Sequence, residues 1–428
     1  LPCIGTMLFT SIYGIVDGLC VSNFVGKTAF AAVNLIMPLP MLLGTIGFML
    51  GTGGSAIVGI TLGEGDQKKA DRYFTLFLLA ALISVSVLAV LGIVFLRPIA
   101  VLLGAKGELL DYAVRYGRIL MVSLPTFALQ NMFQSFFVTA EKPHLGFWFT
   151  VGAGCTNMVL DVLMVGIWGW GVEGAAIATF ISQLVGGVLP VFYFIDRSNS
   201  SRLHLCKTSF YSKVLRDACI NGSSELMTNL SMSLVNILYN FQLLRLAGEN
   251  GVAAYGVIMY AAFLFVAVFV GYAVGSAPIV SFHYGARNHA EVHNLYRKSL
   301  RLIAVVAVTL TLASMFIIPC VARIFVGYDA ELLALTSRAF RLYALSFLIM
   351  GFNVYASSFF TALGDGVTSA LISFLRTLAF QVIAILLLPL LLGIDGIWLA
   401  VTAAELAALA VSAAMLLTKD KVFHYRKV

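Results

Sequence analysis

Apolar stretches separated by short charged or glycine- and proline-rich breaks cover most of the chain. A helix needs about 20 predominantly apolar residues to cross the hydrocarbon core of a bilayer, so dividing the sequence at these breaks predicts twelve transmembrane helices. The predicted spans are residues 1–22, 29–62, 73–97, 110–140, 144–167, 172–195, 213–247, 252–284, 295–323, 333–363, 367–391 and 395–418. The pattern therefore predicts an all-α membrane protein.

The composition agrees with this class. Of 428 residues, 60% are hydrophobic and 11% are charged, whereas a soluble domain carries about 25% charged residues. Apolar sequence begins at Leu1 with no basic segment or cleavage site before it, so we expect no signal peptide. The six cysteines have no paired spacing, which argues against a disulfide framework or a metal cluster.

The basic residues indicate the orientation of the chain. Seventeen lysines and arginines fall on one side of the predicted spans and nine on the other. Because cytoplasmic loops are enriched in basic residues, we expect both termini in the cytoplasm. The net charge of +7 is spread over short loops and does not gather on one face, so it does not indicate a nucleic-acid partner.

The chain contains two similar halves. Residues 103–110 return as residues 326–333, with a shared glycine, glutamate and leucine pair at an offset of 223 positions. A polar segment, residues 196–212, lies between them as a cytoplasmic linker. We therefore expect an N-terminal six-helix lobe over residues 1–195 and a C-terminal six-helix lobe over residues 213–428.

Further repeated positions support the duplication. Arg115 recurs as Arg338 at the same offset, and residues 171–174 recur as residues 393–396, one position out of step. Because six helices return the chain to its starting side, the two copies have the same orientation. They are then related by a pseudo-symmetry axis along the membrane normal, with the substrate path between them.

Two carboxylates lie away from the ends of predicted spans in the N-terminal half. Asp161 follows Asn157 by four residues, and Asp17 follows Tyr13 by four residues, so each acid shares a helix face with a polar neighbour. A charged residue at the bilayer centre costs roughly 2.5–3.5 kcal/mol on insertion scales, and such residues usually mark ion or substrate pathways. The alternatives are a local cap at Asp17 and a structural polar contact at Asp161.

The repeat shows that the two acids have no acidic counterparts in the second half. Asn240 lies opposite Asp17, and Ile383 or Ala384 lies opposite Asp161. Only the N-terminal half carries both carboxylates, which favours a special role for that half.

Three further ionisable residues lie deep in spans of the C-terminal half, namely Glu225, Arg376 and Glu405. One interpretation is a charge network that neutralises itself between helices. The other is a binding site for a cationic substrate. The sequence leaves both open.

Several of these motifs resemble the multidrug and toxic compound extrusion (MATE) transporters. The resemblance covers almost the whole chain and is carried by an early Leu-Pro pair, Tyr13-x-x-x-Asp17, Pro38, Asn157-x-x-x-Asp161, and the segment from Gly171 to Thr179. It implies an antiporter of the inner (plasma) membrane that acts as a monomer and exports amphipathic, cationic small molecules by alternating access between two lobes. It also implies that Tyr13, Asp17, Asn157, Asp161 and Thr179 form the coupling-ion site.

The donor atoms of this set suit either coupling ion. Sodium prefers oxygen ligands, which Asp17, Asn157, Asp161 and Thr179 supply. Protons suit the same pair of acids, because two close carboxylates repel one another and one of them then binds a proton more readily. We expect no cofactor beyond H⁺ or Na⁺.

Two other functions remain as alternatives. A lipid-linked oligosaccharide flippase of the same superfamily usually has more spans and a strongly basic cavity. A membrane-embedded enzyme needs a nucleophile with a base or a metal cluster, but all six histidines fall in loops or at helix ends. We therefore expect a transporter and not an enzyme.

Overall fold

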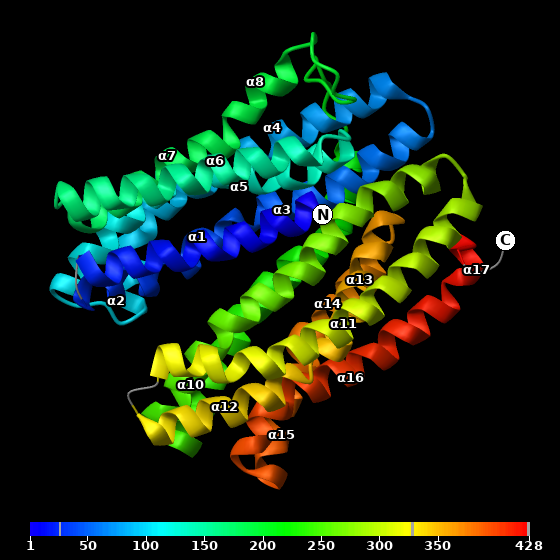
Figure 1. Ribbon diagram of the computed structural model, residues 1–428. Helices are drawn as coiled ribbons and strands as arrows, with labels where there is room; N and C mark the ends of the chain where they lie inside the picture. The colour runs from blue at the N-terminus through cyan, green and yellow to red at the C-terminus, as the bar shows by residue number, and fades with distance from the viewer. Residues whose placement is uncertain (25–26, 327–328, 426–428) are drawn as a thin grey trace. The chain divides into compact units, whose positions relative to one another are not determined.

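Only helices and connecting loops occur in the part of the chain that the structure describes (Figure 1). The computed structural model describes residues 1–24, 27–326 and 329–425, without the side chains of residues 15–24, 27, 28, 30, 31, 34, 249, 321, 324 and 325. The all-α prediction is confirmed.

The chain divides into two compact units, Leu1–Gly222 and Ser223–Val428. The first unit contains α1 (Pro2–Phe24), α2 (Lys27–Ile36), α3 (Pro38–Gly63), α4 (Gln67–Leu102), α5 (Glu108–Thr139), α6 (Pro143–Asp161), η1 (Val162–Ile167), α7 (Gly171–Gly187), α8 (Leu189–Ile195) and α9 (Ser212–Asn221). The second contains α10 (Ser223–Gly285), α11 (His289–Val326), α12 (Ala330–Ala344), α13 (Phe347–Ala362), α14 (Gly366–Phe374), η2 (Leu375–Ala379), α15 (Phe380–Leu392), α16 (Ile394–Thr418) and α17 (Asp420–Phe423).

Each of the twelve predicted spans falls on one of these helices or on a consecutive set of them. Within the described residues, eight helices are long and apolar enough to cross a membrane, and α12 with α13, bent by 46°, gives a ninth. The membrane class predicted from the sequence is therefore confirmed.

Several spans that the sequence pattern treats as continuous are divided in the structure. Residues 29–62 form two helices, because Pro38 begins α3 where its missing N–H needs no partner. Helix α10 has two arms, which are separated at Gly248, where φ is 59° and ψ is −149°. This backbone conformation is open to glycine and costly for other residues, and it lies at the break predicted between residues 247 and 252.

Helix α9 packs against α3 in the first unit, although the sequence boundary assigns residues 213–221 to the C-terminal lobe. Two glycines allow this approach. A Cβ atom on Gly222 would lie 1.9 Å from the carbonyl oxygen of Met49, and one on Gly53 would lie 2.2 Å from that of Ala218. The two backbones therefore pack closely through positions where only glycine fits.

We expect Gly222→Ala to destabilise the protein by about 1–3 kcal/mol, since the added methyl group forces α3 and α9 apart. The measurement is the midpoint of thermal unfolding in detergent or lipid. Gly256→Ala is the matched control, because a Cβ atom there meets nothing within 4 Å and alanine favours a helix. An unchanged midpoint in Gly222→Ala contradicts the close-packing interpretation.

The segment predicted as a linker, residues 196–212, is attached to α4 by hydrogen bonds. The backbone N–H of His204 donates to Asp71 Oδ1 at 3.0 Å, and that of Cys206 donates to Thr75 Oγ1 at 3.1 Å. These bonds fix the segment to the first unit before the chain enters α9.

A repeated ion pair occurs once in each unit. Arg115 of α5 lies 3.6 Å from Glu173 of α7, and Arg338 of α12 pairs with Asp395 of α16. These are the positions that the sequence repeat aligns. Exposed pairs of this kind add little stability, so their value is as a marker that both units have the same internal arrangement.

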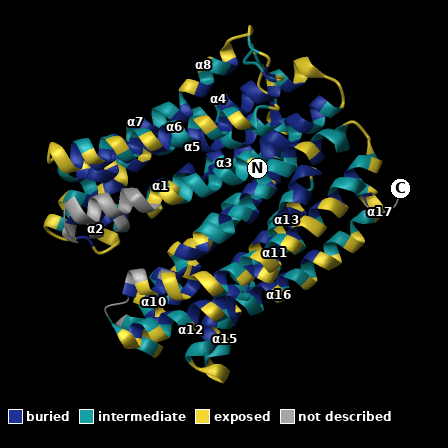
Figure 2. Ribbon diagram, in the orientation of Figure 1, coloured by how far each residue is buried: buried dark blue, intermediate teal, exposed yellow. Residues whose placement is uncertain are grey.

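The outer faces of the long helices are apolar. Along α11 the side chains of Val305, Leu312 and Phe316 are 64%, 57% and 81% exposed, and Figure 2 shows exposed residues along this helix. Their spacing of seven and four residues, about two turns and one turn, places them on one side of the helix, as expected for a face in contact with lipid.

Candidate functional site

The N-terminal acids lie where α1 packs against α6. A Cβ atom on Gly5 would lie 3.1 Å from the ring of Phe147, and one on Gly154 would lie 2.5 Å from Phe9 and 3.0 Å from Tyr13. The contacts advance in the same direction along both helices, so α1 and α6 run parallel. Gly154 lets the aromatic rings of α1 rest directly on α6.

Asn157 and Asp161 lie three and seven residues beyond Gly154, on the face of α6 that packs against α1. Asn157 is 2% exposed and Asp161 is 0% exposed. Among the described residues, Asn157 Nδ2 has no hydrogen-bond partner. A buried N–H donor without a partner is costly and needs an acceptor such as a bound water.

Asp17 belongs to α1, but its side chain lies outside the described residues. The backbone still fixes the height of position 17 along the axis of α1. Because Tyr13 lies beside Gly154 and the helices run parallel, one further turn brings position 17 level with residue 158, between Asn157 and Asp161.

Thr179 lies on α7, which packs against α6. Its hydroxyl donates to the carbonyl oxygen of Ala175 on its own helix at 3.0 Å. Such a bond satisfies the hydroxyl locally and leaves oxygen lone pairs available. Of the predicted set, the structure thus brings Tyr13, Asn157 and Asp161 to one helix–helix contact, while no described contact joins Thr179 to them.

The helices that correspond to the fifth and eleventh spans both change to π-helix. Segment η1 begins directly after Asp161, and segment η2 contains Arg376. Within the described residues these are the π-helical segments of the chain. Because π-helical turns are rare and occur frequently at functional sites, they direct attention to both ionisable residues.

In the second unit, Arg376 and Glu405 form a buried ion pair. Arg376 Nη1 lies 3.3 Å from Glu405 Oε1, with side-chain exposures of 12% and 1%. Asn353 Nδ2 donates to Glu405 Oε2 at 2.7 Å, and Ser412 Oγ donates to Asn353 Oδ1 at 2.8 Å. The sequence pattern missed Asn353 and Ser412. An amide in the middle of an apolar span was the signal, as it was at Asn157.

Glu225 differs from Glu405. It lies in the first turn of α10, is half-buried, and has no ion pair among the described residues. Its helix packs against η2, which carries Arg376. The two C-terminal acids therefore have different environments. Glu405 accepts hydrogen bonds from Arg376 and Asn353, whereas Glu225 has no ion pair among the described residues.

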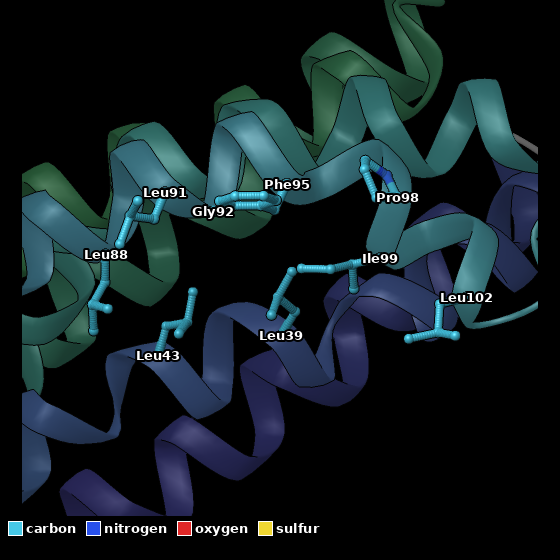
Figure 3. Close-up of a pocket in the computed structure, with 9 residues that line it drawn as sticks. All are labelled: Leu39, Leu43, Leu88, Leu91, Gly92, Phe95, Pro98, Ile99 and Leu102. Atoms are coloured by element: carbon cyan, nitrogen blue, oxygen red, sulfur yellow. The ribbon is translucent and has the colours of Figure 1, made fainter.

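A separate pocket lies between α3 and α4 (Figure 3). Its volume is about 350 Å³, and its lining is apolar throughout. The lining residues are Leu39, Leu43, Leu88, Leu91, Gly92, Phe95, Pro98, Ile99 and Leu102. With no ionisable side chain in its wall, this pocket has nothing to bind a coupling ion.

Comparison with known proteins decides the family. The MatE family model matches residues 2–163 and again residues 226–387, two segments of equal length that together cover more than half of the chain. The chain belongs to the MatE family. It is therefore a membrane transporter and not an enzyme, and the two matches coincide with the sequence repeat.

Curated relatives and solved structures agree with the MatE assignment. "Multidrug export protein MepA" of Staphylococcus saprophyticus subsp. saprophyticus is 21% identical over 423 residues, covering 98% of this chain and 92% of that protein. MepA of Staphylococcus aureus (strain MSSA476) is 22% identical over 421 residues, covering 98% and 92%.

Two solved structures share the fold of this MatE chain. A crystal structure of MATE in complex with MaL6 has a TM-score of 0.94 at 23% identity, covering 99% of this chain and 95% of that one. An outward-facing conformation of a multidrug resistance MATE family transporter has a TM-score of 0.93 at 23% identity, covering 99% and 94%. The two-lobe, twelve-helix fold predicted from the sequence is confirmed.

Proposed function

We propose that this MatE protein is a secondary active antiporter that exports amphipathic organic cations in exchange for protons or sodium ions. The family match and the relatives named as multidrug export proteins support drug export. The observation that carries ion coupling is the burial of Asp161, which is 0% exposed on a helix long and apolar enough to cross the membrane.

The coupling-ion site is formed by Tyr13, Asp17, Asn157, Asp161 and Thr179. The contact between α1 and α6, and the level of position 17 beside residue 158, support a shared site for both carboxylates. Asn157 Nδ2, which has no hydrogen-bond partner among the described residues, supports a site that holds water beside the carboxylates. Either coupling ion is transported cargo, bound in one half of the cycle and released in the other.

Transport proceeds by alternating access between the two lobes of an inner-membrane monomer with both termini in the cytoplasm. The excess of basic residues on one side of the spans supports this orientation. Ion and substrate are coupled because each binds the two conformations unequally, so that the ion shifts the population toward one of them.

The substrate is cationic because the interior of each unit carries acids. In the second unit, Glu225 is the carboxylate available to an ammonium group, whereas Glu405 pairs with Arg376. The acidic interior does not favour a lipid-linked oligosaccharide flippase, whose anionic substrate calls for a basic cavity.

Uptake of a fluorescent organic cation into proteoliposomes tests the proposed function. A proton gradient without sodium, and a sodium gradient at fixed pH, are imposed in separate experiments with wild-type protein. We expect one gradient of the correct polarity to drive uptake against the dye gradient, and collapse of that gradient by an ionophore to stop it. Equal uptake with and without both gradients contradicts an antiporter.

A further inference from the structure

The ionisable side chains Glu225, Arg376 and Glu405 lie away from the ends of the predicted spans of the C-terminal unit, and their charges do not cancel. Glu225 and Glu405 are acids, and Arg376 is a base that pairs with Glu405 and lies on η2, which packs against α10, the helix of Glu225. We propose that Glu405 is a positioning residue that holds Arg376, so that Glu225 offers one uncompensated carboxylate to a singly charged organic cation. The proposal rests on the proposed export of cations and assigns the residues that set the charge of their site.

Glu405 is held in place from two directions. Arg376 Nη1 approaches Oε1 at 3.3 Å, while Asn353 Nδ2 donates to Oε2 at 2.7 Å and to the backbone oxygen of Glu405 at 2.9 Å. Ser412 Oγ in turn donates to Asn353 Oδ1 at 2.8 Å. The row Ser412–Asn353–Glu405–Arg376 thereby fixes the carboxylate that faces the guanidinium.

Burial decides which acid captures Arg376. Glu405 is 1% exposed, and Asn353 and Ser412 are 0% and 1% exposed. A fully buried carboxylate without a cation is strongly unfavourable, and Glu225 is the less buried of the two acids. The guanidinium therefore stays with Glu405, although it attracts both acids.

The repeat indicates that this cluster is not a packing requirement of the six-helix unit. At the offsets of 222 to 224 found between the halves, the counterpart of Arg376 is Gly154, Ala153 or Gly152. In the first unit, small residues there allow α1 to contact α6. The long Arg376 side chain at the same position introduces a charge that the first unit lacks.

The test is a set of charge variants in the complete protein, read as KM and kcat for ion-driven uptake of a monovalent fluorescent cation. In Glu405→Gln the guanidinium of Arg376 loses its buried partner. It then pairs with Glu225 and neutralises the charge of that carboxylate. We expect KM to rise about 10- to 100-fold, the effect of losing one hydrogen bond to a charged group, with kcat changed much less. Uptake of an uncharged substrate should keep its KM.

The double variant Arg376→Gln/Glu405→Gln removes both charges and leaves Glu225 alone, so its KM for the cation should return toward the wild-type value. Ser314→Ala is the matched control, because Ser314 is 0% exposed and bonds to Thr311 of its own helix. An unchanged KM in Glu405→Gln overturns the proposal. So does a double variant whose KM stays about 10- to 100-fold above the wild-type value. This comparison with wild type still decides the case if Glu405→Gln alone fails to fold.

Failure of the inference can be told apart from failure of the proposed function by Glu225→Gln. If that variant keeps the wild-type KM for the cation, Glu225 does not bind substrate and the proposed cation site is wrong. If it raises KM while Glu405→Gln does not, the cation site stands and only the positioning role of Glu405 is refuted.

Discussion

Asp161→Asn is expected to reduce ion-driven transport to the rate measured without a gradient, while the protein folds and binds substrate. The substitution keeps the size of a side chain that is 0% exposed on α6 and removes the charge that binds the coupling ion. If the ion is a proton, the amide mimics the protonated carboxyl group and favours the conformation that the ion stabilises. The measurement is gradient-driven uptake at matched protein density, together with substrate binding.

Glu173→Gln is the control for Asp161→Asn. It removes an acid of the same unit whose side chain is 49% exposed in a surface pair, and we expect wild-type gradient dependence. Loss of transport in both variants would indicate a general effect of negative charge in the first unit. Retention of transport in Asp161→Asn would remove Asp161 from the coupling site.

The second large effect concerns stability. Arg376→Ala is expected to lower the free energy of unfolding by about 3–5 kcal/mol, because it leaves the buried carboxylate of Glu405 without its cation. The midpoint of thermal unfolding measures this loss. Arg376→Ala/Glu405→Ala should recover much of the stability, since neither charge is then buried alone.

The exposed pair in the same unit provides the comparison. Arg338→Ala breaks the ion pair between Arg338 and Asp395, whose side chains are 69% and 27% exposed respectively. This substitution should lower the free energy of unfolding by less than about 1 kcal/mol. If Arg376→Ala is no more destabilising than Arg338→Ala, or if removing Glu405 brings no recovery, Arg376 does not stabilise the unit through Glu405.

The sequence predicted the helices and the duplication well, because bilayer thickness imposes a length on every span and because Arg115 and Glu173 recur as Arg338 and Asp395. It could not locate the breaks within spans. Residues 212–221 remain with the first unit since Gly53 and Gly222 allow α3 and α9 to touch, a contact between residues far apart in the chain.

The sequence predicted the part of the candidate site that depends on spacing within one helix. Asn157 and Asp161 share a face by helix periodicity, but the partner of that face, with Phe9 and Tyr13 resting on Gly154, depends on packing. Asn353 was missed for the same reason. An amide in a span can bond to its own helix or to a neighbour, and only the structure pairs it with Glu405.

The central claim is that coupling belongs to the N-terminal unit, and the symmetric position tests it most directly. Asn240, the counterpart of Asp17, bonds to Asn236 Oδ1 of its own helix at 3.1 Å and cannot titrate. The measurement is uptake rate against imposed ion gradient for wild type, Asp161→Asn and Asn240→Ala at matched density. We predict a flat response for Asp161→Asn and the wild-type slope for Asn240→Ala. A wild-type slope in Asp161→Asn, or a flat response in Asn240→Ala with substrate binding retained, would contradict the assignment and move coupling to Glu225 and Glu405.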